Sequence, residues 1–290
     1  MRGRERKKLK TAIIFMLLPL ILLILFTYVP LVDMVRYSFF KWDGLGEMKF
    51  IGLKNYAELF TNPQYFSVFE TSIFYLIGSF LQIGLALVFA ALLLTKTKFA
   101  NFFKGSIFFP YLINGVAVGF IFLYFYKAGG TLDTLLVSLG MDQENLPLWL
   151  NNRKTVNICL AVVSVWRYLG QNMIMFLGAM QSINQDLFEA ADLDGANGWQ
   201  KFRYIILPGI KSVISINLIL AVKGAISVFE IPYIMTNGAN GSGTFVTKTL
   251  EVAFTSHKIG FASAMGVVLL VIIMVITFIQ KRYFEGKGGK

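Results

Sequence analysis

Long apolar stretches alternate with short polar segments along the whole chain. Six of these stretches are long enough to cross a hydrocarbon core of roughly 30 Å, which takes about 20 helical residues. In lipid every backbone polar group must find its partner within the protein, so stretches of this kind form helices. The pattern predicts six membrane-spanning helices, over residues 11–32, 71–94, 105–126, 155–180, 212–232 and 259–280.

The composition agrees with a protein that lies mainly in lipid. Of the 290 residues, 56% are hydrophobic and 15% are charged, and the mean hydropathy is +0.64. A soluble domain of this size needs far more charge to cover its surface. We therefore expect an all-α integral membrane protein in which residues 1–290 form a single transmembrane domain.

The first apolar stretch raises the alternative of a cleaved signal peptide, because residues 1–10 form a basic leader. Its apolar run is too long for a signal peptide, and no small-x-small cleavage site follows Tyr28. We expect a retained membrane anchor.

The distribution of basic residues predicts the orientation of the spans. If the N-terminus lies inside, the inner segments 1–10, 95–104, 181–211 and 281–290 hold 16 Lys and Arg. The outer segments 33–70, 127–154 and 233–258 are longer together and hold only 9. The positive-inside rule therefore places both termini and the loop 181–211 in the cytoplasm.

Charge and composition exclude several classes of function. The net charge of +11 comes from basic residues at membrane flanks, which favours topology and anionic lipid headgroups over nucleic acid as the explanation. Cys159 is the single cysteine and His257 the single histidine. Disulfides, thiolate metal sites and histidine-based metal or catalytic centres are thereby excluded. We expect no metal, no cofactor and no catalytic residue in this chain.

Small and turn-forming residues predict local features. Gly115 with Gly119, and Ala86 with Ala90, form small-x-x-x-small pairs that allow close helix approach, and we expect them to pack within this chain. Residues 53–60 predict a short helix in the first outer segment. The outer segment that begins TNGANGSGT at Thr236 is rich in turn residues and predicts a flexible loop.

Two predicted spans carry charged residues, namely Arg167 in the fourth and Lys223 and Glu230 in the fifth. A charge at this depth must face the bundle interior, a partner or a wet cavity, and is a functional candidate for that reason. Around them, polar and aromatic residues follow helical spacing and give each span one polar face. These candidates for a substrate pathway are Ser164, Arg167, Tyr168 and Gln171 in the fourth span, and Lys223, Ser227 and Glu230 in the fifth.

Hydroxyls, an amide, a tyrosine ring and paired charges are the groups that a sugar site uses, because sugars need donors, acceptors and an apolar platform. The alternative is that the three charged residues form structural ion pairs between helices or extend to an interface. Gln82 and Asn114 are weaker candidates, since single polar residues in a span often cap a backbone kink.

The polar segment 189–208 lies between two long apolar stretches and has the signals of a short exposed helix. Asn184 can cap it, and Asp186 and Glu189 suit the positive end of the helix dipole. Gly195 offers a stop, and Pro208 suits the first turn of the following span. We expect this helix to dock on a partner.

This segment resembles the EAA loop of ATP-binding-cassette importer permeases. The pattern is E-A-A, three residues, G, nine residues and I-x-L-P, and the chain matches every fixed position from Glu189 to Pro208. The extended form EAAxxDGAxxWQxF, the closing segment 262–284 and the early segment 54–60 resemble the carbohydrate-uptake branch, of the maltose and glycerol-3-phosphate permease type. The large outer domain of some maltose-type permeases is absent, because the second outer loop is short.

The resemblance implies a type I importer permease fold in the cell membrane of a prokaryote. It implies that a second permease subunit completes the pathway, that two ATPase subunits use ATP and Mg²⁺, and that an extracytoplasmic binding protein delivers a carbohydrate. It also implies that the EAA helix couples this chain to the ATPase. The coupling residues would be Phe188, Glu189, Ala190, Ala191, Asp192, Asp194 and Gly195.

Other functions remain open at this point. An ATP-driven importer of another solute could use Arg167 and Lys223 for a phosphate, as in glycerol-3-phosphate, or Glu230 for a polyamine. An ion-coupled secondary transporter would also place charges near the midplane. An intramembrane enzyme has no plausible catalytic set in this sequence.

Overall fold

The computed structural model describes residues 2–94 and 98–286 and is almost entirely helical. Two compact units are described separately: the first comprises Met1–Pro63 and Thr249–Val271, and the second comprises Gln64–Lys248 and Ile272–Lys290. In the described residues, six helical segments are long and apolar enough to cross a membrane, which confirms the predicted all-α membrane fold. They are Phe15–Tyr37, Gln64–Leu94, Gly115–Ser138, Val156–Gln181, Lys211–Thr236 and Ile259–Phe284.

The first unit begins with a long helical run and continues into a small hairpin. The run consists of α1 (Arg2–Leu23), a π-helical turn (Ile24–Tyr28) and α2 (Val29–Tyr37). Strands β1 (Phe40–Lys41) and β2 (Lys49–Phe50) then pair antiparallel. Next come α3 (Lys54–Thr61), which confirms the predicted short helix, the π-helical turn Glu251–Thr255 and the start of α16 (Ile259–Gly286).

Buried polar contacts hold this unit together. The Asn55 side-chain amide donates to the backbone carbonyls of Ser38 and Phe40, at 2.8 and 3.0 Å. At the hairpin tip, the backbone N–H groups of Gly46 and Leu45 donate to the Asp43 carboxylate and lower the pKa of that group.

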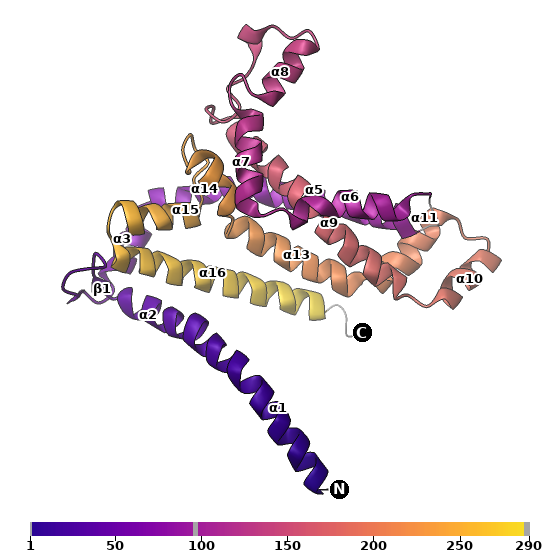
Figure 1. The fold of residues 1–290 in the computed structure, drawn as a ribbon, viewed down its shortest axis with the longest axis horizontal. Helices are drawn as coiled ribbons and strands as arrows, with labels where there is room; N and C mark the ends of the chain where they lie inside the picture. Colours follow the sequence, from indigo (N-terminus) through magenta and orange to yellow (C-terminus); the bar gives the residue numbers. More distant parts are fainter. Residues whose placement is uncertain (1, 95–97, 287–290) are drawn as a thin grey trace. The chain divides into compact units, whose positions relative to one another are not determined.

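The second unit is a bundle in which α5, α9 and α13 pack side by side and α6 packs on α9 (Figure 1). Its core contains Ala86, Met173 and Phe176, none of which has any exposed surface. The helices of the unit, in chain order, are α4 (Gln64–Ser67), α5 (Phe69–Leu94), α6 (Ala100–Leu112), α7 (Gly115–Tyr126), α8 (Thr131–Ser138), the 3₁₀ turn Gln143–Asn145, α9 (Val156–Gln181), α10 (Gln185–Leu193), α11 (Gly198–Lys201), the π-helical turn Phe202–Ile206, α12 (Leu207–Gly209), α13 (Lys211–Ile226), α14 (Glu230–Thr236) and α15 (Phe245–Leu250), whose last residues belong to the first unit.

Small residues lie at the closest helix contacts of this unit. A Cβ atom at Gly119 would lie 2.7 Å from the Ile234 side chain, so the glycine allows α14 to pack against α7. Ala86 and Ala90 are fully buried in the contact of α5 with its neighbours. Both pairs therefore pack within the chain, as predicted.

The third predicted span is wrong as a single helix. Residues 105–126 divide into the end of α6 and the whole of α7, because Ile113 and Asn114 have extended ψ angles of 134° and 137°. The Asn114 side chain accepts a hydrogen bond from the Val116 N–H and starts a new helix, an alternative to helix continuation that asparagine offers and apolar residues do not. The apolar segment that follows runs over Gly115–Ser138.

The fifth span is also interrupted. Helix α13 ends at Ile226, and α14 begins at Glu230 after a short non-helical connection. Ser227 lies at this break, and its hydroxyl donates to the Lys223 carbonyl at 2.8 Å. Because of this break, Glu230 lies at the start of α14 and not within a continuous helix.

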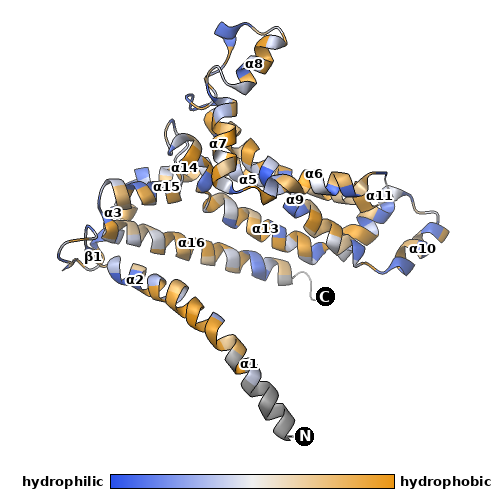
Figure 2. Ribbon diagram, viewed as in Figure 1, coloured by the Kyte–Doolittle hydropathy of each residue, from blue (hydrophilic) through white to orange (hydrophobic). Residues whose placement is uncertain are grey.

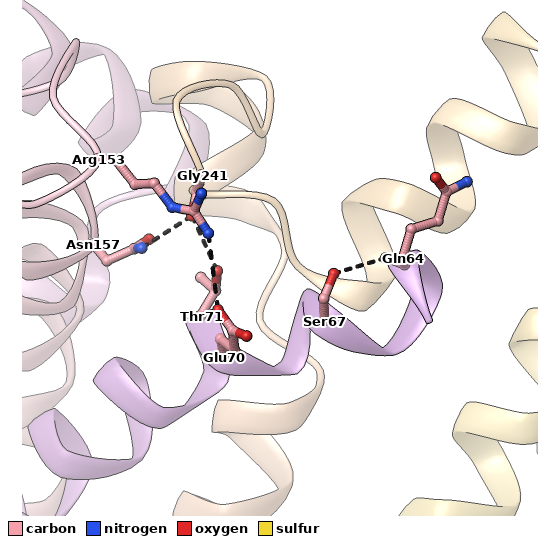
Figure 3. Close-up of polar contacts among 7 residues, drawn as sticks. All are labelled: Gln64, Ser67, Glu70, Thr71, Arg153, Asn157 and Gly241. Carbon is pink, nitrogen blue, oxygen red and sulfur yellow. Dashed lines mark hydrogen bonds and ion pairs between the residues drawn. The ribbon is translucent and has the colours of Figure 1, made fainter. Parts of the chain in front are cut away.

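The loop between α14 and α15 is anchored, contrary to the prediction of a flexible loop. Figure 3 shows the Gly241 carbonyl accepting from Thr71 and from Asn157, at 3.3 and 3.0 Å. Arg153 forms an ion pair with Glu70 beside it, with 3.9 Å between the charged atoms. These contacts tie the loop to the N-terminal ends of α5 and α9.

Candidate functional site

A cavity of about 740 Å³ opens within the second unit, between α5, α9, α13 and α14 and the end of α6. Its wall combines hydrogen-bonding side chains with aromatic rings. The polar and aromatic residues that line it are Tyr75, Ser79, Gln82, Tyr111, Ser164, Arg167, Tyr168, Gln171, Asn172, Asn217, Ser227, Phe229 and Glu230.

The structure brings together six of the seven pathway candidates named from the sequence. They line the cavity and are Ser164, Arg167, Tyr168, Gln171, Ser227 and Glu230. Lys223 differs, since its side chain is exposed and it does not line this cavity. Of the weaker candidates, Gln82 lines the cavity, whereas Asn114 caps α7.

Sequence reasoning missed several residues of the wall. Tyr75 and Ser79 precede Gln82 by seven and three positions on α5, so the helical spacing that revealed the stripe on α9 could have revealed this one. Asn217 is a single polar residue in an apolar run of α13 and gave the same kind of signal. Tyr111 stands at the end of α6, and no pattern in the sequence singled it out.

An ion pair between Arg167 and Glu230 lies at the cavity wall. Arg167 Nη1 donates to Glu230 Oε2 at 2.7 Å, and the two side chains are 11% and 47% exposed. The sequence left open whether the charged residues form a structural ion pair or face a cavity. Arg167 and Glu230 do both, because they form an interhelical ion pair and also line the cavity. No ion pair of Lys223 is found in the described part of the chain.

The ion pair between Arg167 and Glu230 packs against the start of α7. A Cβ atom at Gly115 would lie 1.9 Å from Glu230 Oε2 and 2.6 Å from Arg167 Nη1, so any other residue there would force the ion pair to shift from this position. The carboxylate thus lies at the N-terminal end of a 12-residue helix, where the helix dipole favours negative charge.

Aromatic rings flank the ion pair. The Arg167 guanidinium lies 5.1 Å from the centre of the Tyr168 ring, and the Tyr111 ring lies 6.0 Å from the same ring. Amides and hydroxyls that can both donate and accept line the rest of the cavity. Such a wall can bind a polyhydroxylated molecule through its hydroxyls and its apolar ring faces.

The second candidate site is the loop that joins α9 to α13. Asn184 caps the start of α10, since its side chain accepts a hydrogen bond from the Asp186 N–H. Gly195, which has a φ of +73°, follows the last turn and terminates the helix. The Ala196 N–H donates to the Ala191 carbonyl, which together with the bond from Gly195 to Asp192 forms a Schellman motif. The predicted cap and stop are both confirmed.

Helix α10 extends beyond the ends of α9 and α13 and contains both hydrophilic and hydrophobic residues (Figures 1 and 2). The Asp192 carboxylate pairs with Lys201 of α11, which holds the two short helices together. Four large apolar or aromatic side chains project from this loop, with exposed fractions of 53% for Leu187, 92% for Leu193, 66% for Trp199 and 71% for Tyr204. Exposed apolar groups of this size are typical of a surface that docks on a partner.

The seven predicted coupling residues lie on or beside α10 and differ in exposure. Phe188 is half-buried against the core of the bundle and anchors the helix. Ala191 is also half-buried, and the remaining five, Glu189, Ala190, Asp192, Asp194 and Gly195, are exposed. In residues 2–94 and 98–286, no group of three or more His, Cys, Asp and Glu could hold a metal ion.

A polar cavity between membrane-spanning helices is typical of membrane transport subunits. The chain belongs to the family described as binding-protein-dependent transport system inner membrane components, whose model matches residues 82–287. It is therefore a membrane permease component and not an enzyme.

Curated relatives agree with this family. The chain is 34% identical to the probable ABC transporter permease protein YurN of Bacillus subtilis (strain 168), over 94% of this chain and 95% of that protein. It is 32% identical to the arabinooligosaccharides transport system permease protein AraP of the same organism, over 84% and 80% of the two chains.

A solved structure shares the fold. It is a crystal structure of a bacterial ABC transporter involved in the import of the acidic polysaccharide alginate, with a TM-score of 0.83 and 21% identity, covering 98% of this chain and 99% of that chain. The predicted importer permease fold is confirmed by this match.

Proposed function

We propose that this chain is a permease subunit of an ATP-driven importer of sugars or oligosaccharides, and that its cavity forms part of the translocation pathway. The observation that carries the proposal is the cavity wall, which joins neutral hydrogen-bonding groups to the rings of Tyr111 and Tyr168. The name of the relative AraP, which refers to arabinooligosaccharides, supports the same class of substrate.

The proposed assembly contains a second permease subunit, two ATPase subunits and an extracytoplasmic binding protein. The ATPase subunits would use ATP and Mg²⁺. A related chain of known structure, 19% identical, belongs to an alginate transporter in complex with a periplasmic protein bound to an alginate pentasaccharide, which supports such a delivery partner here. The basic residues of the loop segments support cytoplasmic termini and a cytoplasmic loop 181–211.

Helix α10 would couple this chain to an ATPase subunit. Its exposed face offers Glu189 to basic groups of a cleft, and the small side chain of Ala190 allows a close fit. Asp192, by contrast, already pairs with Lys201. ATP-driven closure of the ATPase pair would move α10 as a rigid element and switch the cavity between outward and inward access. The Phe188 contact with the bundle core supports transmission of that movement to α9 and α13.

Glu189→Lys tests the coupling. The lysine would place a cation where the proposed partner surface is basic, and we expect ATP-dependent uptake to fall by at least about tenfold, as for like charges at an interface. The measurement is uptake of labelled oligosaccharide by proteoliposomes that contain the whole assembly, with ATP inside and the binding protein outside.

Gln185→Lys, one turn earlier on the same exposed helix, is the matched control and should retain most of the uptake. Uptake that persists in Glu189→Lys, or that needs no ATP, would contradict the proposal and favour an ion-coupled carrier.

A further inference from the structure

The cavity wall contains two charged side chains, and they neutralise each other. Among the described residues that line it, only Arg167 and Glu230 carry charge, and they are joined at 2.7 Å. Lys223, the other cation of this region, does not line the cavity. The remaining polar groups are uncharged amides and hydroxyls, namely those of Tyr75, Ser79, Gln82, Tyr111, Ser164, Tyr168, Gln171, Asn172, Asn217 and Ser227.

Glu230 is held in this pair by its surroundings. Its carboxylate lies against the backbone of Gly115 at the start of α7, with no side chain between them. The positive end of the helix dipole stabilises the carboxylate there, in addition to the guanidinium of Arg167. The positive charge of Arg167 is consequently balanced by Glu230, although only Nη1 is engaged and the buried Nε has no hydrogen-bond partner among the described residues.

An acidic sugar would meet an unfavourable wall. Its carboxylate would have to take Arg167 from Glu230, which leaves Glu230 uncompensated, or share Arg167 with Glu230, which places two carboxylates against one cation. Either arrangement leaves one negative charge without a cation of its own, which is unfavourable beside the partly buried pair. A neutral sugar needs only the amides, hydroxyls and rings, and leaves the ion pair intact.

We propose that this cavity selects uncharged oligosaccharides against uronate-containing ones, and that the Arg167–Glu230 ion pair is the determinant of that selectivity. The inference rests on the proposed function and specifies the charge class of its substrate. It also separates this chain from the structural neighbour described as an importer of an acidic polysaccharide, because a shared fold does not set the substrate.

A protection assay tests the selectivity without the binding protein. Ser79→Cys is introduced on the cavity wall in a Cys159→Ala background, which removes the chain's single native cysteine. The purified assembly, in nanodiscs and without nucleotide, is labelled with a fluorescent maleimide, and the labelling of this chain is resolved on a gel.

The two ligands are a linear glucose pentasaccharide and its counterpart oxidised at every C6 to glucuronate, so that the main difference between them is charge. Ser138→Cys, outside the cavity, is the control for labelling without protection.

For the unaltered ion pair, we expect half-protection at a concentration about tenfold lower for the neutral pentasaccharide than for the glucuronate. Glu230→Gln keeps the side-chain shape and frees Arg167, so the preference should shift toward the glucuronate by a similar factor. The double variant Arg167→Gln with Glu230→Gln is again neutral and should restore the preference for the neutral sugar. Because the partner permease is the same in all three, the shift reports on this chain.

Equal protection by both ligands in the unaltered protein, or no shift in Glu230→Gln, overturns the selectivity while leaving the saccharide site in place. A lack of protection by either ligand overturns the saccharide cavity itself, and the proposed function with it. If Glu230→Gln does not assemble, the comparison of the two ligands in the unaltered protein still decides the selectivity.

Discussion

Gly115 occupies a position where one methyl group would collide with an ion pair. The pair between Arg167 and Glu230 lies so close to the start of α7 that a Cβ atom there has no room. Arg167 is almost fully buried and has little space to move, so a methyl group at position 115 would have to push the half-exposed Glu230 carboxylate away from α7. At the residue scale, the ion pair of the cavity wall can lie against α7 because glycine at position 115 has no side chain.

We predict that Gly115→Ala destabilises the protein, since forcing a methyl group into a packed site costs about 1–3 kcal/mol. The expected fall in Tm is roughly 2–4 °C for each kcal/mol. Cys159 is the only cysteine and is buried, so its labelling by a thiol-reactive dye during a temperature ramp reports the unfolding of this chain.

Gly178→Ala is the control, because it also lies in a helix and a Cβ atom there meets nothing within 4 Å. Helical alanine is favoured over glycine by about 0.5–1 kcal/mol, so its Tm should stay the same or rise slightly. Equal Tm values for the two variants would show that the ion pair can move away from α7.

At the scale of the element, helix α10 owes its shape to local signals that the sequence displays. The asparagine cap, the acidic first turn and the left-handed Gly195 all act within a few residues, which is why the helix and its end were predictable. The break between α6 and α7 was not predicted, although its signal is also local. Asn114 stood out in the sequence as a polar residue, but apolar length alone favoured one continuous span.

Gly195→Val should impair coupling more than stability. A β-branched residue at a φ of +73° costs about 1–2 kcal/mol and disturbs the Schellman motif that ends α10. We expect binding-protein-stimulated ATP hydrolysis of the assembly to fall several-fold, with the Tm of this chain lowered by only a few degrees.

Gly198→Ala, three residues further, is the matched control, because Gly198 does not have a positive φ and a Cβ atom there meets nothing within 4 Å. Stimulated hydrolysis that is unchanged in Gly195→Val would mean that the end of α10 takes no part in coupling.

At the scale of the whole molecule, the orientation in the membrane follows from the count of basic residues in its loops. The loop 181–211 should face the cytoplasm and the loop 127–154 the opposite side. In the Cys159→Ala background, a membrane-impermeant maleimide applied to intact spheroplasts should label Ser138→Cys and leave Ser182→Cys unlabelled. Both should react after permeabilisation, and the reverse pattern in intact spheroplasts would refute the orientation.

The sequence by itself determined the membrane class, the approximate places of the six spans and the short capped helix between the fourth and fifth, because hydropathy, capping and turn preferences act over short distances. It also identified Arg167 and Glu230 as functional candidates, since charge in an apolar span is costly wherever it lies.

Only the tertiary structure decided that these two residues, 63 positions apart, pair with each other beside Gly115, and that Lys223 does not line the cavity. Likewise, the loop after α14 has the composition of a flexible turn, and it is ordered by Thr71 and Asn157 from distant helices. Such contacts depend on how helices pack in three dimensions, which no local pattern encodes.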